Sequence, residues 1–435
     1  MKRSLVFFSL FALLGGCSSS SGDGTGGTGG SDGVAIDTFN VALAGAFIPF
    51  EAARRQPIYD AIAANDSDII CLQEVWTQED KEMIQTAAAQ AYPHAVLFEN
   101  TLDTPIDDDT DQQGEVPPTP TEVPCPDRDV GDQNIADQMD QAIDCLRQFC
   151  STTTPDDDGG RTTSAECAES SCVPAVAGLL VGEDPQQQRC YACIITQLPT
   201  ETFGYMRNSC STVVNQDLAF RGQNGVMILS RHPLKDEEEL VIPGTWNRRT
   251  ILSATAELPN GAELDIYCNH LTPLFDSFTF PYTGQYGDGM TDVGGWQAEQ
   301  ELQAEKLINY VTETSGDRPA VILGDLNTGR AFPAQDIVAE GEETLNLLEA
   351  AFAPAYTAEY LEAPLCTFCS TNPVTNPTDD PAETSVWIDH IQLHNLESDS
   401  VLSTARIFDE DVVPVDDMMV PLSDHFGMRS VIDVP

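Results

Sequence analysis

After residue 33 the sequence alternates between segments with the periodicity of a β-strand and segments with that of an α-helix. Residues 34–43, 68–75 and 94–100 carry strand patterns, and residues 51–65 and 79–92 between them carry helical spacing. Because strands that alternate with helices form sheets covered by helices, this order predicts an α/β fold. The two patterns return later, with strands expected at 224–234, 248–258, 262–273, 320–327, 386–395, 400–410 and 423–434, and helices at 294–314 and 335–352.

Residues 101–220 interrupt this pattern. They open with TLDTPIDDDTDQQGEVPPTPTEVP, an acidic, proline-rich linker that can hold neither helix nor strand for long. Beyond the linker, residues 132–150 have helical spacing, and eight of the thirteen cysteines lie between 125 and 210. We therefore expect a disulfide-rich helical insertion at 101–220, within one main domain formed by 34–100 and 221–435.

Thirteen cysteines are many for a reducing compartment, so disulfides are the expected state of most of them. Cys71 and Cys268 sit in apolar strand patterns, and we expect these two to be the cysteines that stay free. A less favoured alternative is a zinc site that combines the C-x-x-C pairs at 190–193 and 366–369. The disulfide connectivity does not follow from the spacing.

The first residues have the pattern of an export signal. Lys2 and Arg3 precede a short apolar run at 5–14, which is too short to span a bilayer. The sequence Leu-Gly-Gly-Cys that ends at Cys17 is similar to the lipobox of bacterial lipoproteins, in which the cysteine becomes a lipidated amino terminus. We expect a signal peptide at 1–16, lipidation at Cys17 and a flexible tether at 17–33. An ordinary signal peptide with a chance cysteine is the alternative.

The charge balance restricts the partners of the chain. Acidic residues outnumber basic residues 70 to 20, which gives a formal net charge of -50. Nonspecific nucleic-acid binding rests on Lys and Arg that neutralise phosphates, so this composition argues against it. It does not exclude a phosphate ester as substrate, because a bound divalent cation reverses the local field.

Polar side chains with catalytic chemistry follow several of the expected strands. Asp325 and Asn327 share one face at the end of a buried strand, because side chains alternate along a strand. A carboxylate such as Glu74 can bind a hard cation, and histidine transfers protons near neutral pH. The candidate residues at strand ends are Asn40, Glu74, His270, Asp325, Asn327, Asp389, Asp424 and His425.

In this order, the motifs resemble the endonuclease/exonuclease/phosphatase superfamily, the DNase I-like group that includes bacterial sphingomyelinases. The matching motifs are Asn40, QE at 73–74, NGV...SR at 224–231, NHL at 269–271, GDLN at 324–327, DH at 389–390 and SDH at 423–425. The resemblance covers residues 34–100 and 221–435. It implies a two-sheet sandwich flanked by helices in four layers.

The resemblance also implies roles for the candidate residues. Mg²⁺, or Mn²⁺ or Ca²⁺ in its place, would be held by Glu74 with help from Asn40 and Asp424. Asp325 and Asn327 would orient the attacking water and a phosphate oxygen. His425, positioned by Asp389, would act as general base or stabilise the transition state. His270 would contact the phosphoryl group or the leaving oxygen.

The function that follows is a metal-dependent phosphoester hydrolase in which water attacks directly, because no G-x-S-x-G or similar nucleophile motif is present. A phospholipid headgroup or a small phosphodiester is the favoured substrate, and a DNA or RNA endonuclease is the alternative. A rival of another class is an inactive surface binding module that keeps the scaffold. The aromatic residues after His270, which are Phe275, Phe278, Phe280, Tyr282 and Tyr286, would either pack a long loop or contact a lipid or a base.

Overall fold

Two mixed β-sheets form the centre of the protein. The computed structural model describes residues 33–106, 123–182, 184–212, 218–275, 280–284, 286, 290–377 and 383–435. The expected signal peptide, Cys17 and nearly all of the tether therefore lie outside the described residues. None of the described helices is long and apolar enough to cross a membrane.

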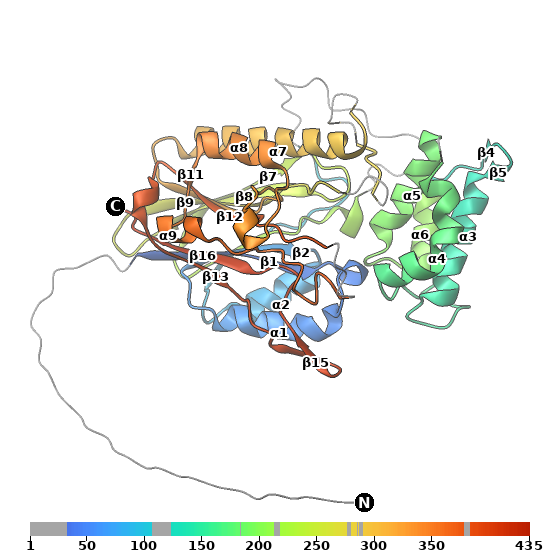
Figure 1. Ribbon diagram of the computed structural model, residues 1–435, viewed down its shortest axis with the longest axis horizontal. Helices are drawn as coiled ribbons and strands as arrows, with labels where there is room; N and C mark the ends of the chain where they lie inside the picture. Colours follow the sequence, from blue (N-terminus) through green and yellow to red (C-terminus); the bar gives the residue numbers. More distant parts are fainter. Residues whose placement is uncertain are drawn as a thin grey trace, which may run out of the picture. The chain divides into compact units, whose positions relative to one another are not determined.

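Each sheet contains six strands, and the two sheets pack face to face (Figure 1). The first has the order β13 (Val401–Ile407), β16 (Gly427–Ile432), β1 (Val34–Leu43), β2 (Ile69–Val75), β6 (Met227–Ser230) and β3 (His94–Val96). The second has the order β11 (Ala353–Pro354), β12 (Asp389–His394), β10 (Ala320–Asp325), β9 (Glu263–His270), β8 (Arg249–Glu257) and β7 (Leu234–Ile242).

Helices cover the outer face of each sheet, as Figure 1 shows. The first sheet packs on α1 (Glu51–Ala64) and α2 (Gln78–Ala88) through the buried side chains Ile58, Ile62, Ile84, Ile70 and Leu72. The second packs on α7 (Asp292–Ser315) and α8 (Glu342–Ala351) through Leu307, Val311, Leu348, Tyr267 and Ile322. A third cluster lies between the sheets. The predicted four-layer α/β sandwich is therefore confirmed.

The remaining short elements lie outside these layers. They are the helix α9 (Ala358–Glu362), the hairpins β4 (Asp129–Val130) with β5 (Gln133–Asn134) and β14 (Val413–Val415) with β15 (Met418–Val420), and the 3₁₀ turns at Gly45–Phe47, Ala219–Gly222, Pro333–Gln335 and Ser398–Ser400.

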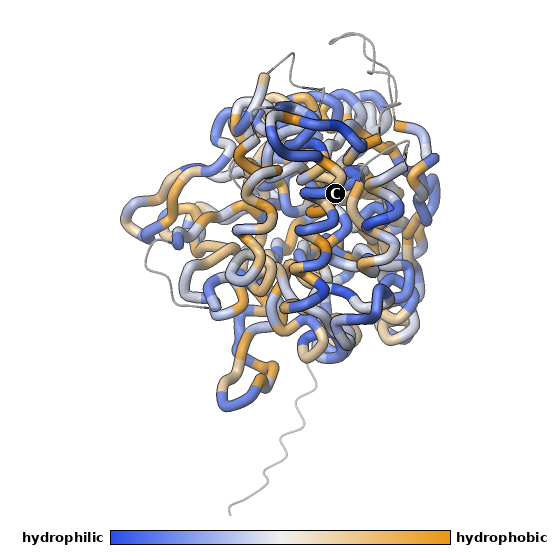
Figure 2. The backbone as a smooth tube through the Cα atoms, turned by 90° about the vertical axis from the view of Figure 1, so that its right-hand side faces the viewer, coloured by the Kyte–Doolittle hydropathy of each residue, from blue (hydrophilic) through white to orange (hydrophobic). Residues whose placement is uncertain are grey.

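The helical part of the insertion has its own apolar core and its own disulfides. Helices α3 (Ile135–Phe149), α4 (Ala165–Leu180), α5 (Pro185–Gln197) and α6 (Phe203–Cys210) surround buried residues that include Ile143, Ile194 and Phe203. Apolar and polar residues also alternate along the helical segments in Figure 2. The disulfides are Cys125–Cys190, Cys145–Cys172, Cys150–Cys167 and Cys193–Cys210. The expected disulfide-rich helical region is present, while its status as a separate domain stays a prediction.

The zinc alternative is wrong in this structure, because each of the four cysteines it needs is in a disulfide. Cys190 and Cys193 bond to other cysteines of the helical region, and Cys366 bonds to Cys369. No sulfur of these residues is left to bind a metal as a thiolate.

The expectation of free thiols at Cys71 and Cys268 is also wrong. The two residues form a fully buried disulfide that joins β2 of one sheet to β9 of the other, with Cα atoms 5.5 Å apart. Their strand patterns showed that both side chains are buried. They did not show that the two strands face each other across the interior, because that is a long-range property of the packing.

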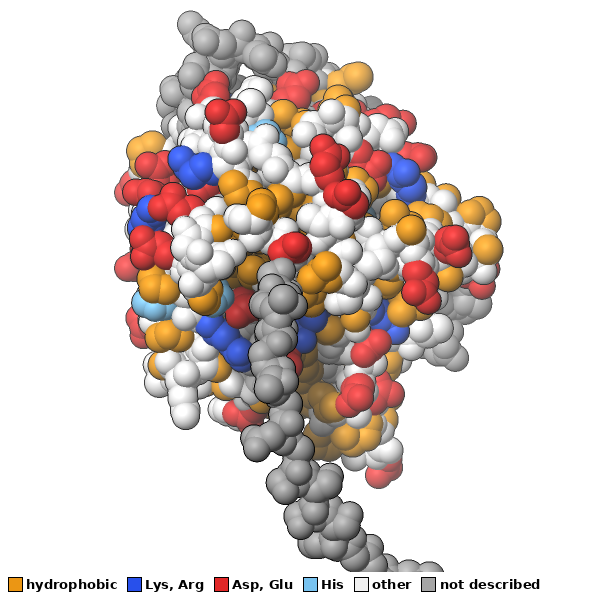
Figure 3. Space-filling view, turned by 90° about the vertical axis from the view of Figure 1, so that its left-hand side faces the viewer, with side chains coloured by type: hydrophobic (Ala, Val, Ile, Leu, Met, Phe, Trp, Pro, Cys, Tyr) orange, Lys and Arg blue, Asp and Glu red, His pale blue; other side chains and the backbone are white. Residues whose placement is uncertain are grey.

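Strand β7 was not predicted, because its sequence LKDEEELVI is dominated by charge. It is the edge strand of the second sheet and pairs only with β8, and Asp236, Glu237 and Glu238 are exposed. Charged side chains on an edge strand oppose pairing with another molecule. Acidic side chains are also spread over the face shown in Figure 3, where basic side chains are fewer.

The disulfide assignments predict the result of a thiol titration. A Cys17→Ser variant that is unfolded without reductant should expose no thiol, because all the other cysteines are paired. Replacing Cys71 and Cys268 together by Ala should lower the free energy of unfolding by up to about 5 kcal/mol, since the bond closes a very long loop. The matched control is Cys145→Ala/Cys172→Ala, which removes a disulfide that closes a shorter loop. It should lower the free energy of unfolding by less. Two reactive thiols in the unreduced protein would contradict the assignment.

Candidate active site

Asn40 lies near the end of β1 and links two carboxylates. Side chains alternate along a strand, so Asn40 shares a face with Ile36, which packs between the sheets. Its amide nitrogen Nδ2 donates to Asp325 Oδ2 at 2.9 Å and to Glu74 Oε1 at 3.2 Å, while its Oδ1 accepts from the backbone N–H of Ala42 at 3.0 Å. In this arrangement the amide group orients the carboxylates. The role of Asn40 as a metal ligand stays a prediction.

Glu74 lies at the end of β2 in an unusual backbone conformation. Its φ of 59° is in the left-handed region, which costs free energy for a residue other than glycine. The turn interrupts the alternation of β2 and brings Glu74 close to Asn40. Burial and the negative charge of Asp424 raise the pKa of Glu74. This carboxylate is therefore placed where a nearby cation would stabilise its ionised form.

Asp325 is the centre of the hydrogen-bond network. It ends β10 on the face that packs between the sheets and is 1% exposed. Its Oδ1 accepts from the backbone N–H of Asn327 at 3.0 Å, and the Asn327 Nδ2 donates to Leu271 O at 2.8 Å. Burial, followed by the charge of Asp389, raises the pKa of Asp325 to about 8.

Gly324, the first residue of the GDLN motif, lies where β10 comes very close to its neighbouring strand. Its φ is 157°, and a Cβ atom there would lie 1.9 Å from Asn269 O on the neighbouring strand β9. Only glycine allows β9 and β10 to approach so closely at this point. The approach keeps Asp325 opposite His270 in the register of the two strands.

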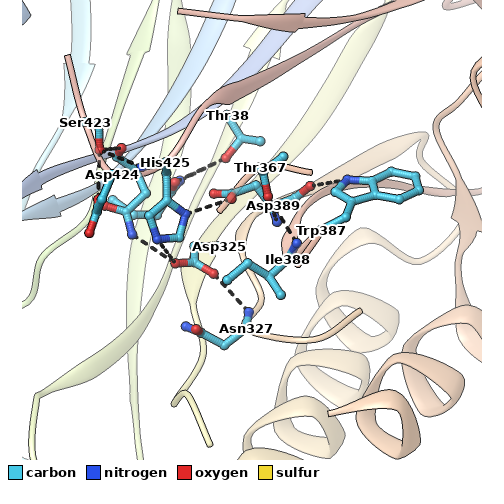
Figure 4. Close-up of polar contacts among 12 residues, drawn as sticks. Thr38, Asp325, Asn327, Thr367, Trp387, Ile388, Asp389, Ser423, Asp424 and His425 are labelled. Atoms are coloured by element: carbon cyan, nitrogen blue, oxygen red, sulfur yellow. Dashed lines mark hydrogen bonds and ion pairs between the residues drawn. The ribbon is translucent and has the colours of Figure 1, made fainter. Parts of the chain in front are cut away.

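His425 and Asp389 form a buried pair beside Asp325, as Figure 4 shows. The His425 Nδ1 lies 2.8 Å from Asp389 Oδ2, and its Nε2 lies 3.7 Å from Asp325 Oδ2. Burial lowers the pKa of His425, but the charges of Asp389 and Asp325 outweigh that effect and raise it well above its ordinary value. The pair therefore favours an imidazolium whose Nε2 side faces Asp325.

His270 lies on the other side of Asp325 and has the opposite electrostatics. Its Nε2 is 3.5 Å from Asp325 Oδ2, and its ring centroid is 6.0 Å from that of Trp76. Burial, followed by the positive charges of Arg249 and His425, lowers its pKa well below 6.5. Its buried Nδ1 has no hydrogen-bond partner among the described residues. A neutral imidazole with a free nitrogen can accept or donate a hydrogen bond to a ligand.

Asp424 lies next to His425 in a segment with several backbone contacts. Asn372 Nδ2 donates to Ser423 O at 2.8 Å and to Asp424 O at 3.1 Å, and Thr375 Oγ1 donates to Asp424 O at 2.8 Å. The hydroxyl of Ser423 lies within hydrogen-bond distance of Asn40 O and of Asp424 Oδ1. These contacts fix the SDH segment against the end of β1.

The structure brings all eight candidate residues together. Hydrogen bonds or ion pairs link six of their side chains, which are those of Asn40, Glu74, His270, Asp325, Asp389 and His425. Asn327 joins them through its backbone N–H, and Asp424 interacts electrostatically with Glu74 and His425. The oxygen atoms of these residues suit Mg²⁺, which prefers carboxylates and carbonyls. Burial, followed by neighbouring carboxylate charge, raises the pKa of Glu74 and of Asp325, and a divalent cation would favour their ionised forms. Atoms of Asp325, Asp389 and His425 also lie within 4.8 Å of one another, a spacing that could hold an ion. The donor set therefore fits the expected metal.

Two arginines, Arg54 and Arg249, interact electrostatically with carboxylates of this cluster. Neither was predicted as a site residue. Arg54 donates to the backbone carbonyls of Pro49, Val41, Leu422 and Ala42. Arg249 is 3% exposed. Its NH1 donates one long hydrogen bond of 3.4 Å to His270 O, and its Nε has no hydrogen-bond partner among the described residues. Burial lowers the pKa of Arg249 to about 10, and Glu74 and Asp325 oppose that effect. In the sequence, Arg249 stands only at the start of the strand expected at 248–258, which does not by itself indicate a place in the site.

His390 follows Asp389 in the sequence, but its ring nitrogens contact residues outside the candidate site. Its Nε2 lies 2.7 Å from Thr328 O and its Nδ1 lies 3.1 Å from the hydroxyl of Tyr356. Burial lowers its pKa to about 4, so the neutral imidazole is the folded form.

The pKa of His390 predicts a pH dependence of stability. The folded pKa lies below the unfolded value, so its stabilising contribution is full above about pH 6.5 and is lost as the pH falls toward 4. At pH 5 the loss should be about 2 kcal/mol. We expect the wild type to lose that much more unfolding free energy between pH 7.5 and pH 5 than His390→Gln, as measured by denaturant unfolding with chelator present. An equal loss in both proteins would contradict the assignment.

The chain is similar to a known family and to several known proteins. Residues 38–425 match the Endonuclease/Exonuclease/phosphatase family. A putative neutral sphingomyelinase of Drosophila melanogaster is 42% identical over 55 residues, and the match spans 12% of this chain and 12% of that relative. Among solved structures, sphingomyelinase C from Streptomyces griseocarneus aligns with 12% identity and a TM-score of 0.49, covering 93% of this chain and all of that chain.

A beta toxin variant from Staphylococcus aureus, solved with bound magnesium ions, aligns with 11% identity and a TM-score of 0.45 and covers 92% of this chain and all of that chain. The family match spans most of the chain and contains every candidate residue. The chain therefore belongs to the endonuclease/exonuclease/phosphatase family.

Proposed function

We propose that this protein is a metal-dependent phosphoester hydrolase in which water attacks phosphorus directly. The observation that carries the proposal is the position of Asp325, whose carboxylate lies within 4 Å of Asn40, His270 and His425. Family membership supports the same reaction class. Cys71 and Cys268, the cysteines in the strands that carry the site, are joined in a disulfide, so neither offers a thiolate nucleophile.

Each residue has a role that follows from its contacts. Glu74, with Asp424, would hold a divalent cation that neutralises charge developing on the phosphate. Asp325 is the acceptor best placed to orient a water molecule, because Asn40 and the Asn327 backbone fix both of its oxygens. His425, held by Asp389, would stabilise negative charge or transfer a proton at its Nε2.

His270 and Arg249 complete the site on the opposite side. The neutral His270 would donate to a phosphate or leaving oxygen. Arg249 is a buried cation with a free donor, and a phosphate oxygen would supply the missing acceptor. Arg54 does not share this role, because backbone carbonyls occupy its donors.

The assignment of these roles is tested by metal removal and by substitution. Chelation should abolish hydrolysis of an aryl phosphodiester, and Mg²⁺ should restore it. Asp325→Ala, His270→Ala and His425→Ala should each lower kcat about 10²-fold or more while the fold is retained. His232→Ala is the matched control, because His232 pairs with Asp68 at 3.1 Å and takes no part in this cluster. Wild-type turnover by a folded His425→Ala protein would show that the SDH assignment is wrong.

The rival function, an inactive surface binding module, is decided by the same assay. The retention of every expected polar side chain in one cluster favours the enzyme. A wild-type protein that hydrolyses no phosphoester above background with Mg²⁺, Mn²⁺ or Ca²⁺ would favour the binding module.

For the substrate we propose a phospholipid headgroup or a small phosphodiester in preference to nucleic acid. The net charge of -50 repels a polyanion. Four arginines are candidates for a basic strip that would favour nucleic acid: Arg221, Arg231, Arg248 and Arg249. Arg248 and Arg249 are buried, Arg221 makes two hydrogen bonds to Glu201, and Arg231 is exposed and donates to Asn65 O, so these residues give a nucleic-acid substrate little support. The short match to a putative neutral sphingomyelinase and the lipid anchor expected at Cys17 favour a lipid.

The aromatic loop after His270 gives this substrate little support. Phe275 and Phe280 pack against Trp246, and Tyr282 packs against Trp296. These contacts favour the reading that the loop packs internally, while Phe278 lies outside the described residues.

The substrate proposal predicts a preference that a parallel assay can measure. At moderate salt and equal Mg²⁺, sphingomyelin vesicles or a soluble phosphodiester should be cleaved with a higher kcat/KM than plasmid DNA. Efficient nicking of the plasmid at a much higher kcat/KM than any lipid or small diester would move the protein to the nuclease branch.

A further inference from the structure

The segment Cys-Thr-Phe-Cys at 366–369, here called the 366–369 loop, lies against the His425–Asp389 pair. The Cys366–Cys369 disulfide closes it over three residue steps. We propose that Thr367 and Phe368 are positioning residues for His425 and Asp389, and that the disulfide holds them in place. The inference deepens the proposed function, on which its catalytic consequences rest.

Thr367 fixes the backbone that carries Asp389. Thr367 is fully buried, and its Oγ1 accepts from the backbone N–H groups of Ile388 at 3.1 Å and Asp389 at 3.2 Å, as Figure 4 shows. Two further backbone bonds run from Thr367 N and Phe368 N to Val386 O. Without the hydroxyl, two buried N–H groups would lack a partner, which costs about 1–3 kcal/mol each. Thr367 therefore fixes the backbone position from which the Asp389 side chain reaches His425.

Phe368 and the backbone of Thr367 contact the other member of the pair. The ring of Phe368 meets the His425 ring edge-on, with centroids 5.1 Å apart, and the two residues form a β-bridge. The backbone N–H of Phe426 donates to Thr367 O at 2.8 Å. The 366–369 loop thus touches the Asp389 segment on one side and the His425 segment on the other. Its conformation determines how the two segments lie relative to each other.

The disulfide and Arg406 hold this loop in its conformation. Thr367 and Phe368 are the two residues inside the small ring that the bond closes, so opening the ring would free their backbone dihedrals. Arg406 NH1 donates to Cys366 O at 3.0 Å, and its guanidinium lies 4.5 Å from the centroid of the Phe426 ring. A disulfide across so few residues adds little to global stability, because the loop it closes is short. Its effect should therefore be local, on the geometry of the pair.

The consequence should appear in turnover more than in substrate binding. The hydrogen bond between His425 Nδ1 and Asp389 Oδ2 is 2.8 Å long, and a displacement on the order of 1 Å can cost up to about 10²-fold in rate. In the described part of the chain the 366–369 loop makes no hydrogen bond, ion pair or ring contact with Glu74 or His270, so KM and the Mg²⁺ requirement should change little.

The experiment compares kcat and KM in four variants. Cys366→Ser/Cys369→Ser and Thr367→Val should lower kcat about tenfold or more with KM within about twofold. Thr367→Ser, which keeps the acceptor hydroxyl, should restore most of the activity. Cys145→Ser/Cys172→Ser, which opens a disulfide of the helical region, is the matched control and should leave kcat unchanged. If Thr367→Val does not fold, the Cys366→Ser/Cys369→Ser protein decides.

A second readout does not depend on activity. The proton shared by His425 and Asp389 should give a downfield resonance in the proton NMR spectrum, which Asp389→Asn removes. We expect this resonance in the wild type and in Thr367→Ser, and its loss or displacement in Cys366→Ser/Cys369→Ser. An unchanged resonance and an unchanged kcat in that variant would overturn the inference. A displaced resonance in a protein that hydrolyses no phosphoester would retain the positioning role and refute the proposed function.

Discussion

The close packing of two β-sheets determines where the central side chains of the candidate site lie. Apolar residues of β1 and β2 in one sheet pack against apolar residues of β9 and β10 in the other. The Cys71–Cys268 disulfide lies in the same apolar cluster and joins β2 to β9. Just beyond this apolar layer, the same faces of the four strands carry Asn40, Gln73, His270 and Asp325. The site is thus a continuation of the core in which polar side chains replace apolar ones.

Burial then sets the electrostatics of that cluster. Glu74, Asp325, Asp389 and Asp424 are close enough for repulsion and desolvation to raise the pKa of Glu74 and Asp325, and three cationic groups, Arg54, Arg249 and His425, offset part of that cost. The pKa values of the two histidines beside Asp325 shift in opposite directions. Burial, followed by the charges of Arg249 and His425, lowers that of His270, whereas the charges of Asp389 and Asp325 outweigh burial and raise that of His425. A site with one neutral and one charged imidazole can offer both a neutral hydrogen-bond donor and a cation to a phosphate.

Much of the fold could be predicted from the sequence, because local periodicity reports strands and helices directly. Strands β1, β2, β8 and β9 follow apolar patterns, whereas β7 is an edge strand whose side chains are charged and exposed, so its sequence resembles a loop. The polar residues at strand ends identified the members of the cluster. The sequence could not reveal Arg249, the Cys71–Cys268 bond or the position of Thr367, since each depends on which distant segments meet in space.

We propose that a divalent cation binds between the carboxylates of Glu74 and Asp424 and thereby completes a hydrolytic site. Anomalous scattering from crystals soaked in Mn²⁺ tests this directly, because it locates the ion without reference to activity. We expect a peak within coordination distance, about 2.0–2.3 Å, of oxygen atoms of both residues, and its loss in Glu74→Gln. A peak held instead by Asp325, Asp389 and His425, or no peak at millimolar Mn²⁺, would contradict it.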